Sequence, residues 1–438
     1  MKRDQLGLKL TGRSLQKPRP EFAASDSRQY DGRDDSSYDG ELSWKVSPGQ
    51  ELGLNLGRNF QKKEMLSRGT PRTTKIKRDH FDAQHKGIWE NTKTTLRVSG
   101  DFYDYEDGAK ARLGTETAQA QLQRAIGESH FIVAGIDAEK NVLRNQAQLT
   151  TGETKASQLA VFIEDSISVT ADSVLTLGLR QTKHDSFGSH LSPRAYLTSQ
   201  LSSDLTLKTG VGTGYKPPGL LEMDPNFHLP SCQGACTMIG NSDLSPEKSV
   251  SYEAGLYFKT ERTGLNLTVF RADLDDMITT YFETIGTDRY RLLKNIDGAR
   301  TQGIEGGASY RLTEMFLLKG NLTYTEARNL TEDRILTNTP RMISNLTGEW
   351  DFSDRLGFHS TLSYHGRRTV ESGGINQQLA EYLLWNLGSS YKIPRQILKE
   401  ASVGFVVENV GNHVLGNDYG YGEPGRRYFA KLNIGISE

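Results

Sequence analysis

Basic residues gather in one segment of this sequence. Between residues 62 and 78 there are seven cations and a single acid, Glu64. The seven cations are Lys62, Lys63, Arg68, Arg72, Lys75, Lys77 and Arg78. Guanidinium groups pair with the oxygens of flat anions and stack on aromatic rings. The segment therefore indicates a site for an oxygen-rich anion.

Further cations and aromatic residues fall in stretches that we expect to be loops. Arg367 and Arg368 follow His365, and Arg426 and Arg427 lie at the start of the last predicted strand. The aromatic residues of these stretches that could stack on the rings of an anion are Tyr215, Phe227, Tyr419 and Tyr421.

The two cysteines, Cys232 and Cys236, are four residues apart in the longest predicted loop. A disulfide across this small ring would pin the tip of the loop, and Gly234 supplies the backbone freedom that the ring needs. Free thiols are the alternative. A metal site would need further soft or imidazole ligands, and His228 is the one candidate nearby.

The residue types and spacings do not favour an enzyme. Residues 420–425 spell the glycine fingerprint of dinucleotide-binding proteins, but they contain a proline and open a strand rather than a helix. His80 and His85 are five apart on one predicted strand, so they point to opposite faces. No Ser-His-Asp set or carboxylate pair stands out. We therefore predict no catalytic residues, no metal site and no cofactor.

Composition limits the class of protein. The chain has 438 residues, of which 35% are hydrophobic, and a net charge of -1. No run approaches the roughly 18 apolar residues of a membrane-spanning helix, which excludes a helical membrane protein. A lipid-facing barrel remains possible because only alternate residues in each strand must be apolar. The near-zero charge gives no sign of a nucleic-acid partner.

Apolar and polar residues alternate along the whole chain, as in Leu6, Leu8 and Leu10 with small or polar residues between them. This alternation predicts twenty strands, which begin near residues 4, 37, 51, 75, 94, 115, 129, 154, 173, 189, 205, 248, 264, 288, 315, 337, 355, 380, 400 and 425. Short turns alternate with longer polar connections, of which the longest is 215–247 and another is 62–74.

Short turns at one end and long loops at the other are typical of a transmembrane β-barrel. We therefore predict an all-β fold, an antiparallel up-and-down barrel of about 20 strands that occupies residues 1–438 as one domain. A soluble barrel of this size would need bulky apolar residues inside, whereas the predicted inner face carries Lys, Arg, Glu, Thr and Gly.

Seven short motifs, taken in chain order, resemble the landmarks of the TonB-dependent outer-membrane receptors. They are Gly214-Tyr215-Lys216-Pro217-Pro218, Gly240-Asn241, Leu244-Ser245-Pro246-Glu247, Tyr252-Glu253-Ala254-Gly255, the stretch from Asn295 to Gly306, Glu408-Asn409-Val410 and Glu423-Pro424-Gly425-Arg426. The resemblance covers essentially the whole chain. It is strongest to the receptors for ferric enterobactin and other catecholate siderophores and to the colicin I receptor.

The resemblance implies a receptor in the outer membrane of a Gram-negative bacterium that takes up a ferric siderophore of the catecholate type, energised through TonB. A ferric catecholate is a bulky trianion, so the candidate ligand-binding residues are the cations and aromatic residues named above. They are Arg68, Arg72, Lys75, Tyr215, Phe227, Arg367, Arg368, Tyr419, Tyr421 and Arg426.

The sequence departs from the family pattern at both ends. The family has a signal peptide, a TonB box and a plug before a 22-strand barrel, and here these and the first strand pair are absent. We therefore expect a truncated form, whose contact with the TonB complex would need a plug that this chain lacks. At the other end, Glu438 stands where barrels of outer membranes usually carry an aromatic residue, which bears on assembly.

Three alternatives remain open at this stage. The barrel could be a plugless passive pore, or a surface receptor for a bacteriocin such as a colicin or for a phage. An enzyme that modifies membrane lipid would need a clustered nucleophile and base, which the sequence does not show. The loop cations could also bind the phosphates of lipopolysaccharide, in contact with outer-membrane lipid, or keep the loops solvated.

Overall fold

The structure, a computed structural model, describes residues 5–17, 32–67, 70–232, 236–372, 375–394, 400–413 and 425–435. Strands of nine or more residues dominate these described ranges. Five shorter strands and one short helix lie among them. None of the helical residues in the described ranges forms a segment long and apolar enough to cross a membrane.

Two compact units make up the chain. The first comprises residues 1–196, 211–250 and 274–298, and the second comprises residues 197–210, 251–273 and 299–438.

The first unit contains the strands from β1 to β9 in chain order. They are β1 (Leu6–Lys17), β2 (Gly32–Ser47), β3 (Gln50–Ser67), β4 (Thr70–Trp89), β5 (Thr92–Glu106), β6 (Lys110–Ile126), β7 (His130–Arg144), β8 (Glu153–Thr170) and β9 (Ser173–His184). The long loop of this unit holds α1 (Leu220–Met223), β12 (His228–Ser231) and β13 (Cys236–Ile239).

Five strands contribute residues to both units. They are β10 (Gly188–Gln200), β11 (Leu205–Lys216), β14 (Glu247–Lys259), β15 (Thr263–Ile285) and β16 (Asp288–Thr313). The second unit adds β17 (Phe316–Asn329), β18 (Arg334–Ile335), β19 (Met342–Asp351), β20 (Leu356–His365), β21 (Arg368–Ser372), β22 (Ile375–Leu379), β23 (Tyr382–Lys392), β24 (Glu400–Glu408) and β25 (Arg427–Gly435).

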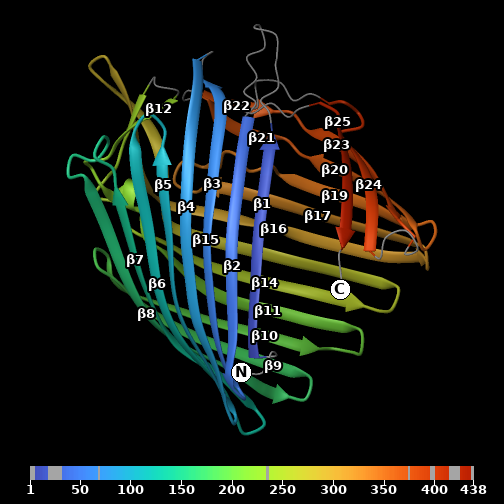
Figure 1. Cartoon of the computed structure of the whole chain (residues 1–438). Helices are drawn as coiled ribbons and strands as arrows, with labels where there is room; N and C mark the ends of the chain where they lie inside the picture. Colours follow the sequence, from blue (N-terminus) through green and yellow to red (C-terminus); the bar gives the residue numbers. More distant parts are fainter. Residues whose placement is uncertain are drawn as a thin grey trace. The chain divides into compact units, whose positions relative to one another are not determined.

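In the first unit, each strand from β1 to β9 pairs antiparallel with the next, and Figure 1 shows β1 to β8 side by side. One face of this sheet carries a row of Leu8, Leu42, Leu54, Ala83 and Val98, which are directly opposite one another. All four of the larger side chains in that row are exposed. We call this side the leucine face.

The opposite side of the same sheet, which we call the polar face, carries charges in ion pairs. Lys9 lies opposite Glu41, with 3.1 Å between Nζ and Oε1, and Arg180 lies 2.6 Å from Asp137. Because side chains alternate along a strand, adjacent residues such as Leu8 and Lys9 lie on opposite faces. The sequence pattern therefore appears in the structure as two chemically different surfaces.

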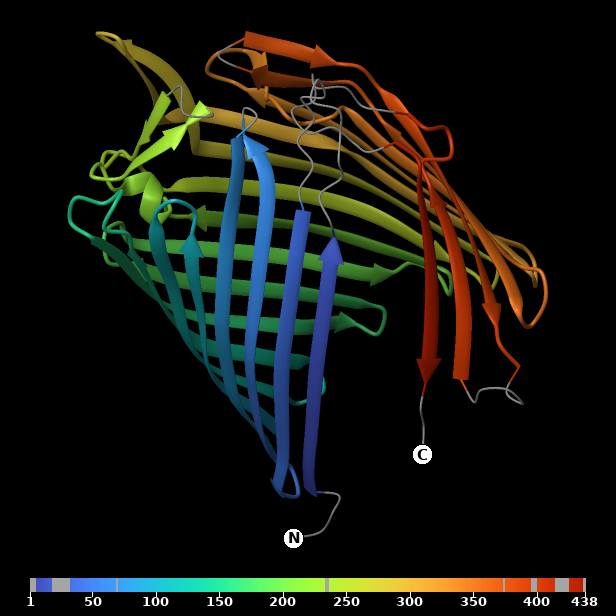
Figure 2. The same cartoon turned by 45° about the horizontal axis from the view of Figure 1, so that its top comes forward.

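The second unit shows the same alternation. Its strands β17, β19, β20, β23, β24 and β25 pair antiparallel in that order, and Figure 2 shows them as adjacent orange and red ribbons. Leu346, Leu362 and Trp385 lie opposite one another in a single row. Leu346 and Trp385 are exposed.

Twenty of the 25 strands that the structure describes are long, as the sequence predicted, but one predicted connection is wrong. Residues 62–67 continue β3 and residues 70–74 begin β4, where we expected a loop from 62 to 74. The sequence pattern did not indicate these strand ends, because charged residues occupy both faces there. A strand that continues beyond the apolar zone no longer needs an apolar side chain at every second position. The longest loop also contains a helix, α1, and a hairpin, which its sequence did not indicate.

The two faces predict opposite outcomes for the same substitution. Replacing Leu54, in the middle of β3, by Arg places a charge on the leucine face and should destabilise the protein in a bilayer by about 2–4 kcal/mol. Replacing its neighbour Asn55 by Arg places the charge on the polar face, between Glu41 and Asp82 in the register, and should be tolerated. Denaturant unfolding from lipid vesicles measures both, and an equal loss in the two variants would contradict the assignment of the faces.

Candidate functional site

The strand register divides the basic segment between the two faces. Lys62 and Lys75 lie directly opposite each other on the leucine face, and Lys75 is 3.5 Å from Glu106. Arg72 lies on the polar face, where its Nε donates to Asp107 at 2.6 Å. This corrects the expectation for Lys75, since a side chain on the leucine face cannot share a ligand with one on the polar face. Arg68 lies outside the described residues.

Arg78 forms the centre of a cluster on the polar face. Its Nε and Nη2 donate to the carboxylate of Asp101 at 2.7 and 2.6 Å. Its guanidinium carbon lies 5.5 Å from the ring centre of Tyr103, and Tyr103 stacks on Tyr105 at 5.9 Å. Arg78 is one of the cations of the basic segment, whereas neither tyrosine was predicted. Their alternation with Phe102 and Asp104 in β5 is the signal that could have found them.

The two aromatic residues predicted in the longest loop region, Tyr215 and Phe227, have different surroundings. The ring of Tyr215 stacks on His190 at 4.5 Å, and its hydroxyl group is buried with no hydrogen-bond partner among the described residues. Phe227, by contrast, is only 2% exposed and packs with Leu143 and Leu149. The prediction that Phe227 stacks on a ligand is therefore wrong, because its ring is part of a small apolar core.

The cations predicted in the second unit anchor backbone or other side chains. Arg367 forms a bidentate ion pair with Glu381. Its Nε donates to Oε2, and its Nη2 donates to Oε1 at 3.0 Å. Arg426 donates from Nη2 to the carbonyl oxygen of Val410 at 2.5 Å. Arg368 opens the hairpin of β21 and β22. Tyr419 and Tyr421 lie outside the described residues.

A carboxylate holds the two ends of the longest loop to β15. Glu247 accepts a hydrogen bond from Lys216 Nζ at 2.8 Å and another from the backbone N–H of Ile278 at 2.7 Å. Its side chain is only 14% exposed, whereas that of Lys216 is 66% exposed. One acidic residue therefore links the residues that begin and end the loop.

An asparagine completes this anchor. The Oδ1 atom of Asn295 accepts from the backbone N–H of Ser245 at 2.8 Å, and its Nδ2 donates to the carbonyl oxygens of Ser245 and Asp276 at 2.9 and 2.5 Å. Asn241 donates from Nδ2 to the carbonyl oxygen of Leu293 at 3.0 Å. These two amides therefore bind backbone groups of the loop and of strands β15 and β16.

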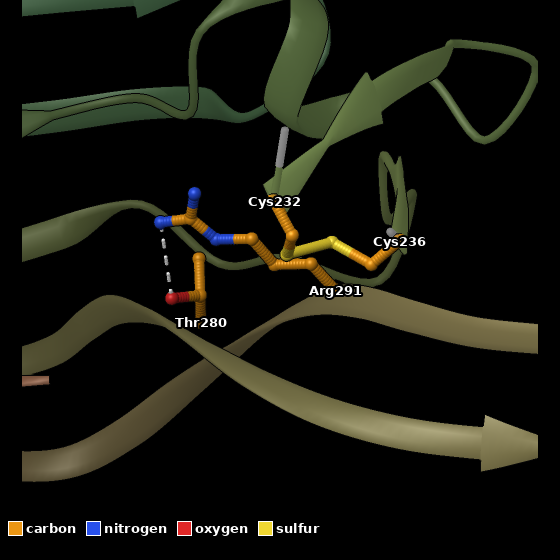
Figure 3. Close-up of a disulfide and its surroundings, with 4 residues drawn as sticks. All are labelled: Cys232, Cys236, Thr280 and Arg291. Carbon is orange, nitrogen blue, oxygen red and sulfur yellow. Dashed lines mark hydrogen bonds between the residues drawn. A yellow bond between two sulfur atoms is a disulfide. The ribbon is translucent and has the colours of Figure 1, made fainter. Parts of the chain in front are cut away.

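The tip of the longest loop is fixed by a disulfide and by strand pairing. Cys232, directly after β12, and Cys236, the first residue of β13, are joined, and β12 and β13 pair antiparallel. β13 then pairs in parallel with β16, where Met238 lies opposite Arg291. Figure 3 shows the side chain of Arg291 beside the disulfide, with its guanidinium reaching Thr280 at 3.4 Å.

Comparison with known proteins decides the family. The family model described as TonB dependent receptor-like, beta-barrel matches residues 3–410. The chain belongs to this family. It is a β-barrel of the outer membrane and acts as a receptor rather than as an enzyme.

The relatives agree with this assignment. An iron-regulated outer membrane virulence protein of Vibrio cholerae is 29% identical over 98% of this chain and 69% of its own length. A ferric enterobactin receptor of Pseudomonas aeruginosa is 24% identical over 92% of this chain and 66% of its own length. The chain thus spans about two thirds of the length of these curated relatives.

Solved structures share the fold. The siderophore receptor PirA from Acinetobacter baumannii matches with a TM-score of 0.85 and 20% identity, over 98% of this chain and 75% of that one. A mutant of the ferric enterobactin receptor from Pseudomonas aeruginosa matches with the same TM-score and 21% identity, over the same shares. In a barrel of this family, the leucine face meets lipid and the polar face lines the lumen.

The family motifs in the middle of this barrel have a structural explanation. Lys216, Asn241, Glu247 and Asn295 all belong to motifs that carried the resemblance, and all form the anchor at the base of the longest loop. Gly240 is also required there, because a Cβ atom would collide with the carbonyl oxygens of Leu221 and Asp224. These residues hold the loop in place; they need not contact a ligand.

Replacing Asn295 by Ala should loosen this anchor. The variant leaves the N–H and C=O groups of Ser245 and the C=O group of Asp276 without their partner, at a cost of about 1–3 kcal/mol. Amide hydrogen exchange at Ser245 should then be about tenfold faster or more. Asn55→Ala on β3 is the matched control, and an unchanged rate at Ser245 in the Asn295 variant would refute the anchor.

The contact between Arg367 and Glu381 should survive moderate acid. Hydrogen bonds from Arg367 and from backbone lower the pKa of Glu381 from 4.5 to about 2. A depressed carboxyl pKa contributes stability that is complete above the unfolded value and is lost as the pH falls through the folded value. Proteolysis of the segment 366–381 should therefore stay slow from pH 7 to pH about 4 and accelerate toward pH 2.

Glu381→Gln gives the control for this pH dependence. The variant should be cleaved rapidly already at pH 7, since an amide cannot replace the charge. If wild type and variant showed the same pH profile, the ion pair would not be what holds the segment.

Proposed function

We propose that this barrel binds a ferric siderophore of the catecholate type and takes it up through the outer membrane with energy delivered through TonB. The observation that carries the proposal is the cluster of Arg78, Tyr103 and Tyr105 on the lumen-facing wall of the first unit. Ferric enterobactin receptors among the relatives support the choice of cargo.

The chemistry of the cluster fits a ferric catecholate. Such a complex is a trianion built from flat rings that carry oxygens. Arginine offers five N–H donors, and the contacts of Arg78 with Asp101 use two of its nitrogens. The remaining donors suit the oxygens of the complex, and the stacked Tyr103 and Tyr105 offer faces for its rings.

Other groups support the same wall. Arg72 lies on the lumen-facing side of β4 and adds a second guanidinium, held by Asp107. Asp101 orients Arg78 through two hydrogen bonds.

Substitutions in this cluster test the proposal. Arg78→Gln combined with Tyr103→Leu removes one charged donor and one ring, so the affinity for ferric enterobactin should fall about tenfold or more. Equilibrium binding of iron-labelled ferric enterobactin to outer membranes measures the loss. Lys75→Gln is the matched control, because Lys75 lies three residues before Arg78 in the same strand but on the lipid side.

The proposal requires that the double variant and the control differ in their affinity for ferric enterobactin. If the double variant bound ferric enterobactin as tightly as the wild type, the cluster would not be the binding wall. If Lys75→Gln weakened binding by the same factor, the effect would come from the overall charge and not from the cluster.

Uptake measurements separate transport driven through TonB from passage through an open pore. Cells whose receptor joins this barrel to a plug with a TonB box should accumulate iron from ferric enterobactin, and accumulation should stop in a strain without TonB. Accumulation that continued at an equal rate without TonB would instead identify a passive pore.

A further inference from the structure

A histidine lies next to the Arg78 cluster on the polar face of the first unit. His80 is two residues after Arg78 in β4, so the two side chains share this face. In the strand register, His80 lies directly opposite Asp101, the acid that binds Arg78. Two residues of a strand span about 7 Å, which is within one Debye length at physiological salt. A charge on His80 would therefore act on an anion held by Arg78.

A second carboxylate reaches the His80 ring from the other side. Nε2 of His80 lies 3.3 Å from Oδ1 of Asp39 on β2, although strand β3 runs between the two residues. Gly57 of β3 makes this approach possible, because a Cβ atom there would collide with Cε1 of His80 and with Oδ1 of Asp39. The ring thus has one carboxylate on each side, Asp39 on β2 and Asp101 on β5.

The ring is a titratable group in a partly shielded position. Its side chain is 19% exposed, and Nδ1 is buried without a hydrogen-bond partner among the described residues. Carboxylates close to a histidine favour its protonated form, whereas burial opposes protonation. Histidine is the side chain whose charge ordinarily changes between about pH 5 and 8. Of the groups in this cluster, His80 is therefore the one that can change its charge in this range.

The register also gives the remaining charged and titratable groups around His80. On strands β1 to β6, apart from Arg78, Asp39 and Asp101, those in its own row and in the two adjacent rows of the polar face are Lys9, Arg13, Glu41, Asp82 and Tyr103. Both acids of this set have a cation of their own. Glu41 pairs with Lys9, and Asp82 accepts from Nε of Arg97.

The charge next to Arg78 depends on the His80 ring. With a neutral ring, Arg78, Asp39 and Asp101 together carry one excess negative charge, which repels a trianion. With a protonated ring, the four side chains are neutral as a set. Electrostatic repulsion between this part of the wall and an anionic ligand therefore weakens as the pH falls.

We propose that protonation of His80 strengthens the binding of a ferric catecholate to the Arg78 cluster, so that the site holds its ligand more tightly at about pH 5.5 than at about pH 8. The inference rests on the proposed function and adds a pH dependence to it. The sign follows from charge, because the proton that His80 gains removes the negative excess next to the trianion. The gain in affinity is complete below the range in which the ring titrates and is lost above it.

Binding at two pH values tests this inference. Iron-labelled ferric enterobactin is titrated onto outer membranes that contain the wild type or His80→Gln, at about pH 8 and about pH 5.5. From the higher to the lower pH, the affinity of the wild type should rise about three- to tenfold relative to that of His80→Gln. Changes in the ligand itself are common to both proteins and cancel in this ratio.

His85→Gln is the matched control, because His85 lies on the leucine face of the same strand, where its Nε2 contacts Gln50. This variant should keep the pH dependence of the wild type. Asp39→Asn removes one carboxylate from His80 and should shift the rise in affinity to lower pH, an effect that a purely structural role would not produce. Resistance to unfolding in SDS at room temperature confirms that each variant is folded.

The outcomes separate this inference from the proposed function. If the wild type bound ferric enterobactin equally well at both pH values, or if His80→Gln followed the same profile, the pH dependence would be refuted while the binding site remained. If the wild type bound no ferric enterobactin at either pH, the proposed function itself would fail, and this inference with it.

Discussion

Every other feature of this protein depends on the strict alternation of side chains across hydrogen-bonded strands. In a bilayer, each backbone N–H and C=O group must have a partner within the protein, and neighbouring strands provide it. Once the ladders are set, the register fixes the face of every residue. Leu54 and Asn55 are adjacent in sequence, yet one meets lipid and the other meets the lumen. A shift of one residue would exchange the two surfaces completely.

The same constraint explains how charge is distributed in the wall. On the lumen side, cations such as Arg78 and Arg180 lie beside carboxylates, which keeps the surface wet and close to neutral. Toward the long connections, the lipid side also becomes charged, at positions such as Lys62 and Lys75. A strand can carry charge on both sides only where neither side contacts hydrocarbon, so the change marks the upper limit of the apolar zone.

The longest loop obeys a different rule, because its backbone leaves the strand ladders. Its base is held by Glu247 and Asn295, whose side chains bind backbone groups that would otherwise lack partners. Its middle packs Phe227 against Leu149, and its tip carries the disulfide. Three different interactions thus hold one loop on the strands of the first unit. The family motifs at its base are explained by this anchoring.

The sequence by itself determined the fold class, the number of long strands and most of their starting points, since alternation and turn residues are local signals. It did not locate the end of β3 or the start of β4, because charged residues on both faces remove the alternation that marks a strand. It placed Lys75 and Arg72 in one site, whereas the register sets them on opposite faces. The tertiary structure also buried Phe227 among Leu143 and Leu149 and placed the guanidinium of Arg78 over the ring of Tyr103. Such contacts depend on which residues face each other across strands and loops, and composition and spacing along one chain do not contain that information.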